Sequence, residues 1–424
     1  MLYHKTIPPN IHGCLCAVQA ACKGEITYDL AERKRKEDIM GKKKQMRSEV
    51  KGNVKNSIGR IAFAALAVLL QIGWILVLMI KLYQYSSVIS LLTSLFALVV
   101  ALRIYGKHTN AAFKMPWIIV ILAFPVFGLC IYGLFGHKEA MHKIIRKFED
   151  VDAQLVPLNL QDETVVERLE AEDPMAANQC YYIRKYGNYP VYDATDVKFY
   201  PEAYLGYEEQ LKELEKAKYF IFLEYHAIEE AEAFARLKDV LARKAAEGVE
   251  VRILYDDVGC IGFLDKSFID RMNAIGVQCR VFNYVVPFLN IFMNNRDHRK
   301  IMIIDGKVGF TGGYNLADEY FNITHPYGYW KDTGVKLTGR AVQSFTMMFL
   351  QMWDVSSVHF TPEVYSKYLD VPQPAHEKEA GYVIPYGDSP LDRDLVGEMV
   401  YMDIINRANR YGHIMTCLLY TSPS

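Results

Sequence analysis

The residues best suited to chemistry lie in the stretch 294–313, which reads NNRDHRKIMIIDGKVGFTGG. His298 and Lys300 are two residues apart in this stretch, and the apolar segment that follows has the composition of a β-strand. On an extended chain this spacing places the imidazole and the ammonium on one face, while Ile301 and Ile303 point to the other face and can anchor the strand. We therefore expect the two polar side chains to meet one ligand group together.

A neutral imidazole beside an ammonium is suited to phosphoryl transfer. His298 can attack phosphorus in line, and Lys300 can neutralise the non-bridging oxygens as negative charge builds in the transition state. Such chemistry requires no metal, and we expect neither a metal nor another cofactor. The eight cysteines include no C-x-x-C pair and match no zinc-site pattern, so we interpret them as ordinary thiols.

The alternative interpretation of His298 and Lys300 is a solvated strand end, because an H-x-K-x4-D spacing can arise by chance. Residues at fixed distances beyond it favour the catalytic interpretation. Gly312 and Gly313 would let the backbone approach a phosphate closely, and Asn315 adds an amide that can hold an oxygen or position a neighbour. Asp305 lies at a predicted turn between two strands, where it should secure the loop rather than attack.

The whole pattern resembles the signature of the phospholipase D superfamily, with matches at His298, Lys300, Asp305, Gly312, Gly313 and Asn315. Longer stretches starting at Phe222, Asn294 and Tyr329 are similar to bacterial cardiolipin synthases of the phospholipase D type. The resemblance runs from about residue 60 to about residue 416. It implies that His298 is one of a pair of active-site histidines and that Lys300 binds phosphate.

The resemblance also implies a supporting role for one acidic residue. Asp332 matches a carboxylate that orients the histidine and stabilises its charged form in relatives, although it could instead be a loop acid. Independently of the resemblance, Glu224 and His226 lie at the end of a predicted parallel strand, where α/β sites tend to form. We interpret Glu224 as a group behind the site and His226 as structural.

The implied reaction is phosphatidyl transfer between two phosphatidylglycerol molecules, which gives cardiolipin and glycerol through a phosphatidyl-histidine intermediate. A second histidine must protonate the departing glycerol and later deprotonate the incoming hydroxyl. The only other H-x-K begins at His376, where Val383 replaces the acid and no glycine pair follows. The tail at 417–424 also departs from the family, so we expect a truncated second half and a chain inactive alone, unless two copies form a homodimer.

Strands and helices alternate around these residues, which predicts an α/β fold with a phospholipase D-like sheet flanked by helices. The expected strands are 219–226, 249–255, 277–282, 301–304 and 308–310. The expected helices are 206–218, 229–247, 265–275 and 395–410.

Three apolar runs precede this region, at 61–80, 88–102 and 117–135. They predict two or three transmembrane helices before the catalytic domain, and hence a multi-pass protein of a bacterial plasma membrane. Buried core helices are the alternative, and Pro125 and Gly128 weaken the prediction for the third run.

These patterns divide the chain into a basic, disordered segment at 1–60, a membrane anchor at 61–136, a charged helical linker at 137–190, a first catalytic half at 191–360 and a truncated second half at 361–424. The expected partners are phosphatidylglycerol, other anionic phospholipids and the bilayer. A formal net charge of -1 and the lack of a basic stripe argue against nucleic acid. Phospholipase D and phosphatidylserine synthase remain alternatives, which differ from a cardiolipin synthase in the acceptor of the phosphatidyl group. A nuclease of the same superfamily and an inactive membrane scaffold are two further alternatives.

Overall fold

The computed structural model describes residues 87–107, 111–135, 142–284, 296–357, 364–373, parts of 66–80, and 381–414 except 390, 393 and 395. Two predictions lie outside the described residues: the disordered segment 1–60 and the unusual tail 417–424. Parts of the first apolar run and the motif at 376–378 lie outside them as well.

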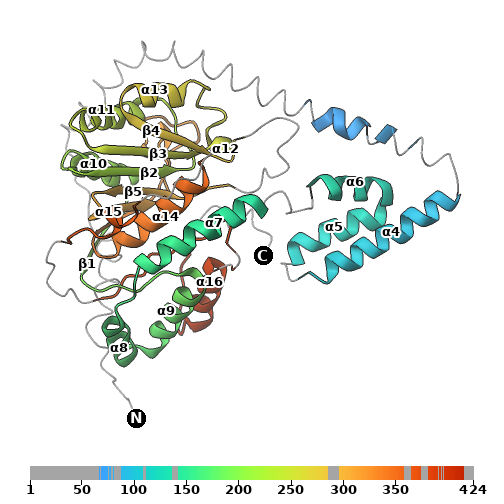
Figure 1. Cartoon of the computed structure of the whole chain (residues 1–424), viewed down its shortest axis with the longest axis horizontal. Coiled ribbons are helices and arrows are strands. Elements are labelled where there is room, and N and C mark those ends of the chain that lie inside the picture. The colour runs from blue at the N-terminus through green and yellow to red at the C-terminus, as the bar shows by residue number, and fades with distance from the viewer. Residues whose placement is uncertain are drawn as a thin grey trace.

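A seven-stranded mixed sheet forms the centre of residues 195–339, in the order β1-β7-β6-β5-β2-β3-β4. Figure 1 labels five of its strands, β1 to β5. Its strands are β1 (Thr195–Tyr200), β2 (Phe220–Tyr225), β3 (Glu250–Asp256), β4 (Val277–Phe282), β5 (Lys300–Ile304), β6 (Val308–Gly312) and β7 (Gly334–Gly339). Strands β2, β3 and β4 are parallel because helices connect them, whereas β5, β6, β7 and β1 pair antiparallel. The predicted α/β fold with a sheet flanked by helices is confirmed.

Helices cover both faces of this sheet (Figure 1). One face packs against α10 (Ala203–Leu214), α11 (Glu232–Ala246), α12 (Asp257–Cys260) and α13 (Phe268–Ala274). The other face packs against α14 (Val342–Val355), which in turn packs against α7 (His142–Leu155). Ile301 and Ile303 belong to the core under α14, while Met302 and Ile304 belong to the core on the opposite face, so the expected alternation along β5 is confirmed.

Smaller elements complete the described part of the chain. They are η3 (Val156–Leu158), α8 (Glu163–Glu172), α9 (Pro174–Gly187), η4 (Asp318–Phe321), α15 (Ser366–Leu369) and α16 (Val396–Arg407). The helix expected at 395–410 is α16, which packs against α9.

The helices of the segment 61–136 differ from the membrane anchor that the sequence predicts there. The described residues contain α4 (Ser87–Tyr105), α5 (Ala111–Ala123) and α6 (Pro125–Phe135), and no described helix combines the length and apolarity required to cross a bilayer. The apolar run at 117–135 is interrupted at Phe124. It comprises the second half of α5, a helix of 13 residues, and the whole of α6, a helix of 11 residues. At about 1.5 Å per residue, each is shorter than the roughly 30 Å hydrocarbon core. The predicted transmembrane helices and the multi-pass arrangement are therefore not supported.

Candidate active site

The proposed nucleophile lies where two neighbouring strands end. Lys300 of β5 pairs with Tyr225 of β2 in antiparallel register, so the residue after β2 and the residues before β5 come together. His226 and His298 meet there, with ring centroids 4.6 Å apart and ring planes tilted by 56°. Both histidines therefore lie at the same end of the two central strands β2 and β5.

Asp256, at the end of β3, fixes the segment that carries His298. Its carboxylate is fully buried and accepts hydrogen bonds from the amides of Val258 and Gly259, at 2.9 and 3.2 Å. It also accepts one from the amide of Asp297 at 3.0 Å. One buried side chain thus caps α12 and holds the backbone next to the histidine.

Lys300 is buried next to this segment, and its Nζ donates to the carbonyl oxygen of His298 at 2.7 Å. Burial lowers the pKa of Lys300 to about 8, although the carboxylates of Asp297, Asp332 and Asp256 oppose the change. The ammonium is therefore poorly solvated. An anion placed beside it would stabilise its charged form.

The His298 side chain is exposed at the surface, with the neighbouring protein covering part of the ring. This partial desolvation, together with the nearby Lys300 and His226, lowers its pKa to about 4 against an opposing effect of Asp297. Because that value lies well below neutral pH, the ring is neutral at pH 7. A neutral imidazole has the lone pair that nucleophilic attack requires.

Asp305 occupies the turn between β5 and β6 with a left-handed φ of 53°. Its carboxylate accepts backbone hydrogen bonds from Lys218, Tyr219 and Phe220 at 2.9, 2.7 and 2.9 Å. These contacts anchor the start of β2, at the end of the strands opposite to the histidines. The geometry agrees with a role in securing the loop.

Asp332 lies against the glycine pair. Its carboxylate accepts hydrogen bonds from the Thr333 amide at 2.9 Å and from Trp330 Nε1 at 3.4 Å. A Cβ on Gly313 would lie only 2.1 Å from Asp332 Oδ1, so this glycine makes room for the carboxylate. Among the hydrogen bonds of the described residues, none joins Asp332 to the His298 ring, so the expected orienting contact is not formed here.

Gly312 and Asn315 also have partners within the protein. A Cβ on Gly312 would approach the Thr333 carbonyl oxygen and the Tyr314 ring to 2.7 Å each. The buried Asn315 accepts a hydrogen bond from the Ala227 amide at 3.1 Å and donates one to the Tyr320 hydroxyl at 2.9 Å. Asn315 therefore positions the chain that follows His226.

Glu224 lies on the opposite face of the sheet from Lys300, toward α14. Arg299 Nε donates to Glu224 Oε1 at 2.6 Å, and the same guanidinium donates to the Met348 carbonyl of α14 at 3.0 Å. Burial raises the pKa of Glu224, with Arg299 opposing and Asp297 reinforcing the change. Glu224 thus lies behind the histidine segment and contacts it through Arg299.

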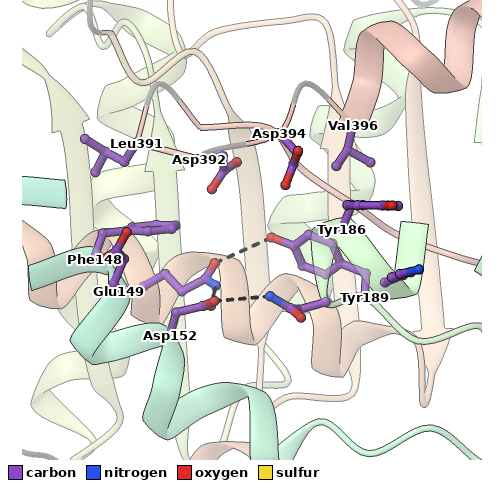
Figure 2. Close-up of a pocket in the computed structure, with 13 residues that line it drawn as sticks. Phe148, Glu149, Asp152, Tyr186, Tyr189, Leu391, Asp392, Asp394 and Val396 are labelled. Carbon is purple, nitrogen blue, oxygen red and sulfur yellow. Dashed lines mark hydrogen bonds between the residues drawn. The ribbon is translucent and has the colours of Figure 1, made fainter. Parts of the chain in front are cut away.

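A pocket of about 410 Å³ opens on the α14 side of the sheet. It lies between α7, the end of α9, α14 and the segment that includes Leu391, Asp392, Asp394 and Val396 (Figure 2). Figure 2 shows Asp152, Tyr189 and Asp392 on its walls. Neither His298 nor Lys300 lines it, so this pocket is separate from the candidate active site. No group of three or more His, Cys, Asp or Glu side chains within the described ranges is arranged to hold a metal ion.

Sequence reasoning singled out neither Asp256 nor Asp297. Asp256 acts on a backbone amide 41 residues away, which no local spacing reveals. Asp297 adjoins His298 in the sequence, and that adjacency was the one available signal. His226 was interpreted as structural, yet its ring contacts that of His298.

Comparisons with known proteins agree with the motif. The family described as "Cardiolipin synthase, PLD-like domain" matches residues 211–353, and the family "Phospholipase_D-nuclease N-terminal" matches residues 93–137. An uncharacterized protein of Streptococcus mutans serotype c is 40% identical over 304 residues, which cover 71% of this chain and 65% of the relative. A cardiolipin synthase of Geobacillus kaustophilus is 34% identical over 329 residues, covering 76% of this chain and 63% of the relative.

Among solved structures, the phospholipase D family member Nuc from Salmonella typhimurium is 17% identical, with a TM-score of 0.30. The match covers 40% of this chain and 100% of that one. The chain spans less than two thirds of the length of the two curated relatives described above.

Proposed function

We propose, from the premise that the chain belongs to the phospholipase D superfamily through its cardiolipin synthase-type domain at residues 211–353, that it transfers a phosphatidyl group with His298 as nucleophile. The proposed donor is phosphatidylglycerol in a bacterial membrane, and the proposed products are cardiolipin and glycerol. The observation that carries the proposal is the neutral His298 ring beside the buried ammonium of Lys300.

The first step forms a bond between a ring nitrogen of His298 and phosphorus and breaks the bond between phosphorus and the departing glycerol oxygen. Lys300 neutralises the non-bridging oxygens as their charge grows. The ammonium already lies close to the His298 backbone, with 2.7 Å between Lys300 Nζ and the carbonyl oxygen. Its poor solvation by water makes an incoming phosphate a favourable partner.

The second step reverses the bonding. A hydroxyl oxygen of the second phosphatidylglycerol attacks phosphorus, the bond to His298 breaks, and the hydroxyl proton passes to a base. One group must therefore give a proton to the first glycerol and take one from the second alcohol. The 424 residues carry one complete H-x-K-x4-D motif, so we assign this group to a matching half-site, in a longer protein or in a second copy.

A donor with an acidic leaving group separates the nucleophile from this second half-site. Phosphatidyl-p-nitrophenol releases a phenolate that needs no protonation, so the chain should release about one p-nitrophenolate per active site in a rapid burst. His298→Ala should abolish the burst, and Lys300→Met should slow it by roughly 100-fold or more, as when a transition-state donor is lost. A burst that survives His298→Ala would contradict the proposed nucleophile.

Product analysis with phosphatidylglycerol vesicles then identifies the acceptor. Cardiolipin and glycerol in equal amounts support the proposed transfer. Phosphatidic acid in their place would make the enzyme a phospholipase D, and serine-dependent formation of phosphatidylserine would make it a phosphatidylserine synthase. Each of these outcomes leaves the role of His298 intact but overturns the proposed acceptor.

A further inference from the structure

A second imidazole stands beside the proposed nucleophile. His226 leaves the end of β2, His298 precedes β5, and their ring centroids are 4.6 Å apart. The motif that suggested the reaction contains His298 but assigns nothing to His226. The motif therefore does not explain why the His226 ring lies against the His298 ring.

Two contacts fix the His226 ring in place. Its Nδ1 lies 2.8 Å from the carbonyl oxygen of Asp297, and since a carbonyl only accepts, Nδ1 must carry the proton. Gly259 of α12 packs against the other side, where an added Cβ would lie 2.8 Å from His226 Nε2 and 2.1 Å from the His226 carbonyl oxygen. The ring thus has little room to turn, and in its neutral form Nε2 is the ring nitrogen that carries no proton.

The charges around the two rings differ. Asp256 Oδ1 lies 3.9 Å from His226 Nδ1, with Arg296 3.4 Å from the same oxygen. The nearby charged groups that affect His298 are Lys300 and Asp297, in addition to His226 itself. The ammonium of Lys300 disfavours a proton on the His298 ring.

We propose that His226 is a positioning residue for His298, which packs against the nucleophilic ring and keeps it neutral by electrostatic repulsion whenever His226 carries a proton. Two imidazolium rings in contact repel each other, so the pair holds one proton more readily than two. The inference rests on the proposed nucleophilic role of His298. It is consistent with the lowered pKa of His298, to which His226 contributes after desolvation and Lys300.

Two substitutions separate charge from packing. His226→Asn keeps an N–H donor near the Asp297 carbonyl but removes the titrating ring, while His226→Phe keeps an aromatic ring and removes both the donor and the charge. In either folded variant, NMR of histidine-labelled full-length protein should show the pKa of His298 rising from about 4 by at least about half a unit. The acidic limb of the p-nitrophenolate burst rate should move upward by the same amount.

Unmodified protein provides an independent test, which does not depend on how the variants fold. Its two histidines should titrate as a coupled pair, so the His298 resonances should also shift at the pH where His226 titrates. A His298 titration that is single, simple and unchanged in both variants would overturn the proposal.

The NMR readout does not depend on turnover, so the two proposals can fail separately. Coupled titration together with a burst that survives His298→Ala would retain the coupling and reject the nucleophile. Independent titration together with a burst that requires His298 would reject the role of His226 alone.

Discussion

Replacing Lys300 by Met should stabilise the folded protein while slowing transfer by roughly 100-fold or more. Lys300 is buried, with only 7% of the residue exposed, and burial lowers its pKa from 10.5 to about 8. Since each unit of pKa corresponds to about 1.4 kcal/mol, keeping this lysine charged in the folded state costs about 3 kcal/mol. Methionine has a similar length and carries no such penalty.

The substitution also removes one favourable contact. Lys300 Nζ donates to the His298 carbonyl at 2.7 Å, and leaving that acceptor without a partner costs about 1 kcal/mol. The expected net gain near pH 7 is therefore about 2 kcal/mol. For a cooperative unit of about 200 residues, this gain corresponds to a rise in melting temperature of roughly 4–8 °C.

The pH dependence has a definite sign. Below pH 8 the lysine is charged in both folded and unfolded protein, so the full penalty is present. Between pH 8 and 10.5 the unfolded chain binds more protons, which makes native stability rise with pH. The advantage of the Met variant should consequently shrink as the pH approaches 10.5.

Thermal unfolding at pH 7 and pH 10, followed through the fluorescence of buried Trp353, measures both effects. Lys266→Met is a matched control, because Lys266 is exposed and its replacement should change stability by less than about 0.5 kcal/mol. A folded Lys300→Met protein that is less stable than the native protein at pH 7 would refute the reasoning. So would an advantage of equal size at both pH values.

Three further substitutions test the scaffold of the site by urea unfolding. Gly313→Ala should destabilise the folded protein by about 1–3 kcal/mol, because the added Cβ would lie 2.1 Å from Asp332 Oδ1. Gly262→Ala is the control, because its Cβ would enter open space, and equal effects of the two substitutions would contradict the expected clash. Asp305→Asn should lower the free energy of unfolding by about 2–4 kcal/mol, since an amide cannot accept all three backbone hydrogen bonds, and a change under about 0.5 kcal/mol would exclude this anchoring role. Asn315→Ala leaves the buried Ala227 amide without its acceptor and should cost about 1–3 kcal/mol, whereas unchanged stability would mean that another group satisfies that amide.

Much of the sheet could be predicted from the sequence. The strand expected at 277–282 coincides with β4. The strand expected at 219–226 is one residue longer than β2 at each end, and the one expected at 301–304 begins one residue after the start of β5. Strands β2 and β5 are buried on both faces, so their apolar composition alone marks them. The alternation at Ile301 and Ile303 likewise predicts the face that they bury.

Other elements carry weaker signals. Strand β1 reads TDVKFY, with polar residues and partly exposed positions at the sheet edge, and β7 begins and ends with glycine. Helix α14 is buried almost all round, so it lacks the polar face that reveals an amphipathic helix. Nothing local distinguishes these segments from loops or from apolar core runs.

The site shows a similar division. His298 and Lys300 could be found because a two-residue spacing on a strand fixes their shared face. The contact of His226 with His298 depends on the antiparallel register of β2 and β5, which brings together residues 72 positions apart. The family pattern suggested a contact from Asp332 to His298, but the carboxylate instead lies against Gly313 and accepts from Thr333.

The most direct test of the central claim is to locate the covalent intermediate. The full chain is mixed with phosphatidyl-p-nitrophenol, quenched in alkali within the burst, and digested for tandem mass spectrometry under conditions that preserve phosphohistidine. The account predicts a phosphatidyl group on His298 at close to one per burst equivalent, and none in His298→Ala. A burst accompanied by modification of another residue, or by no covalent adduct at all, would contradict it.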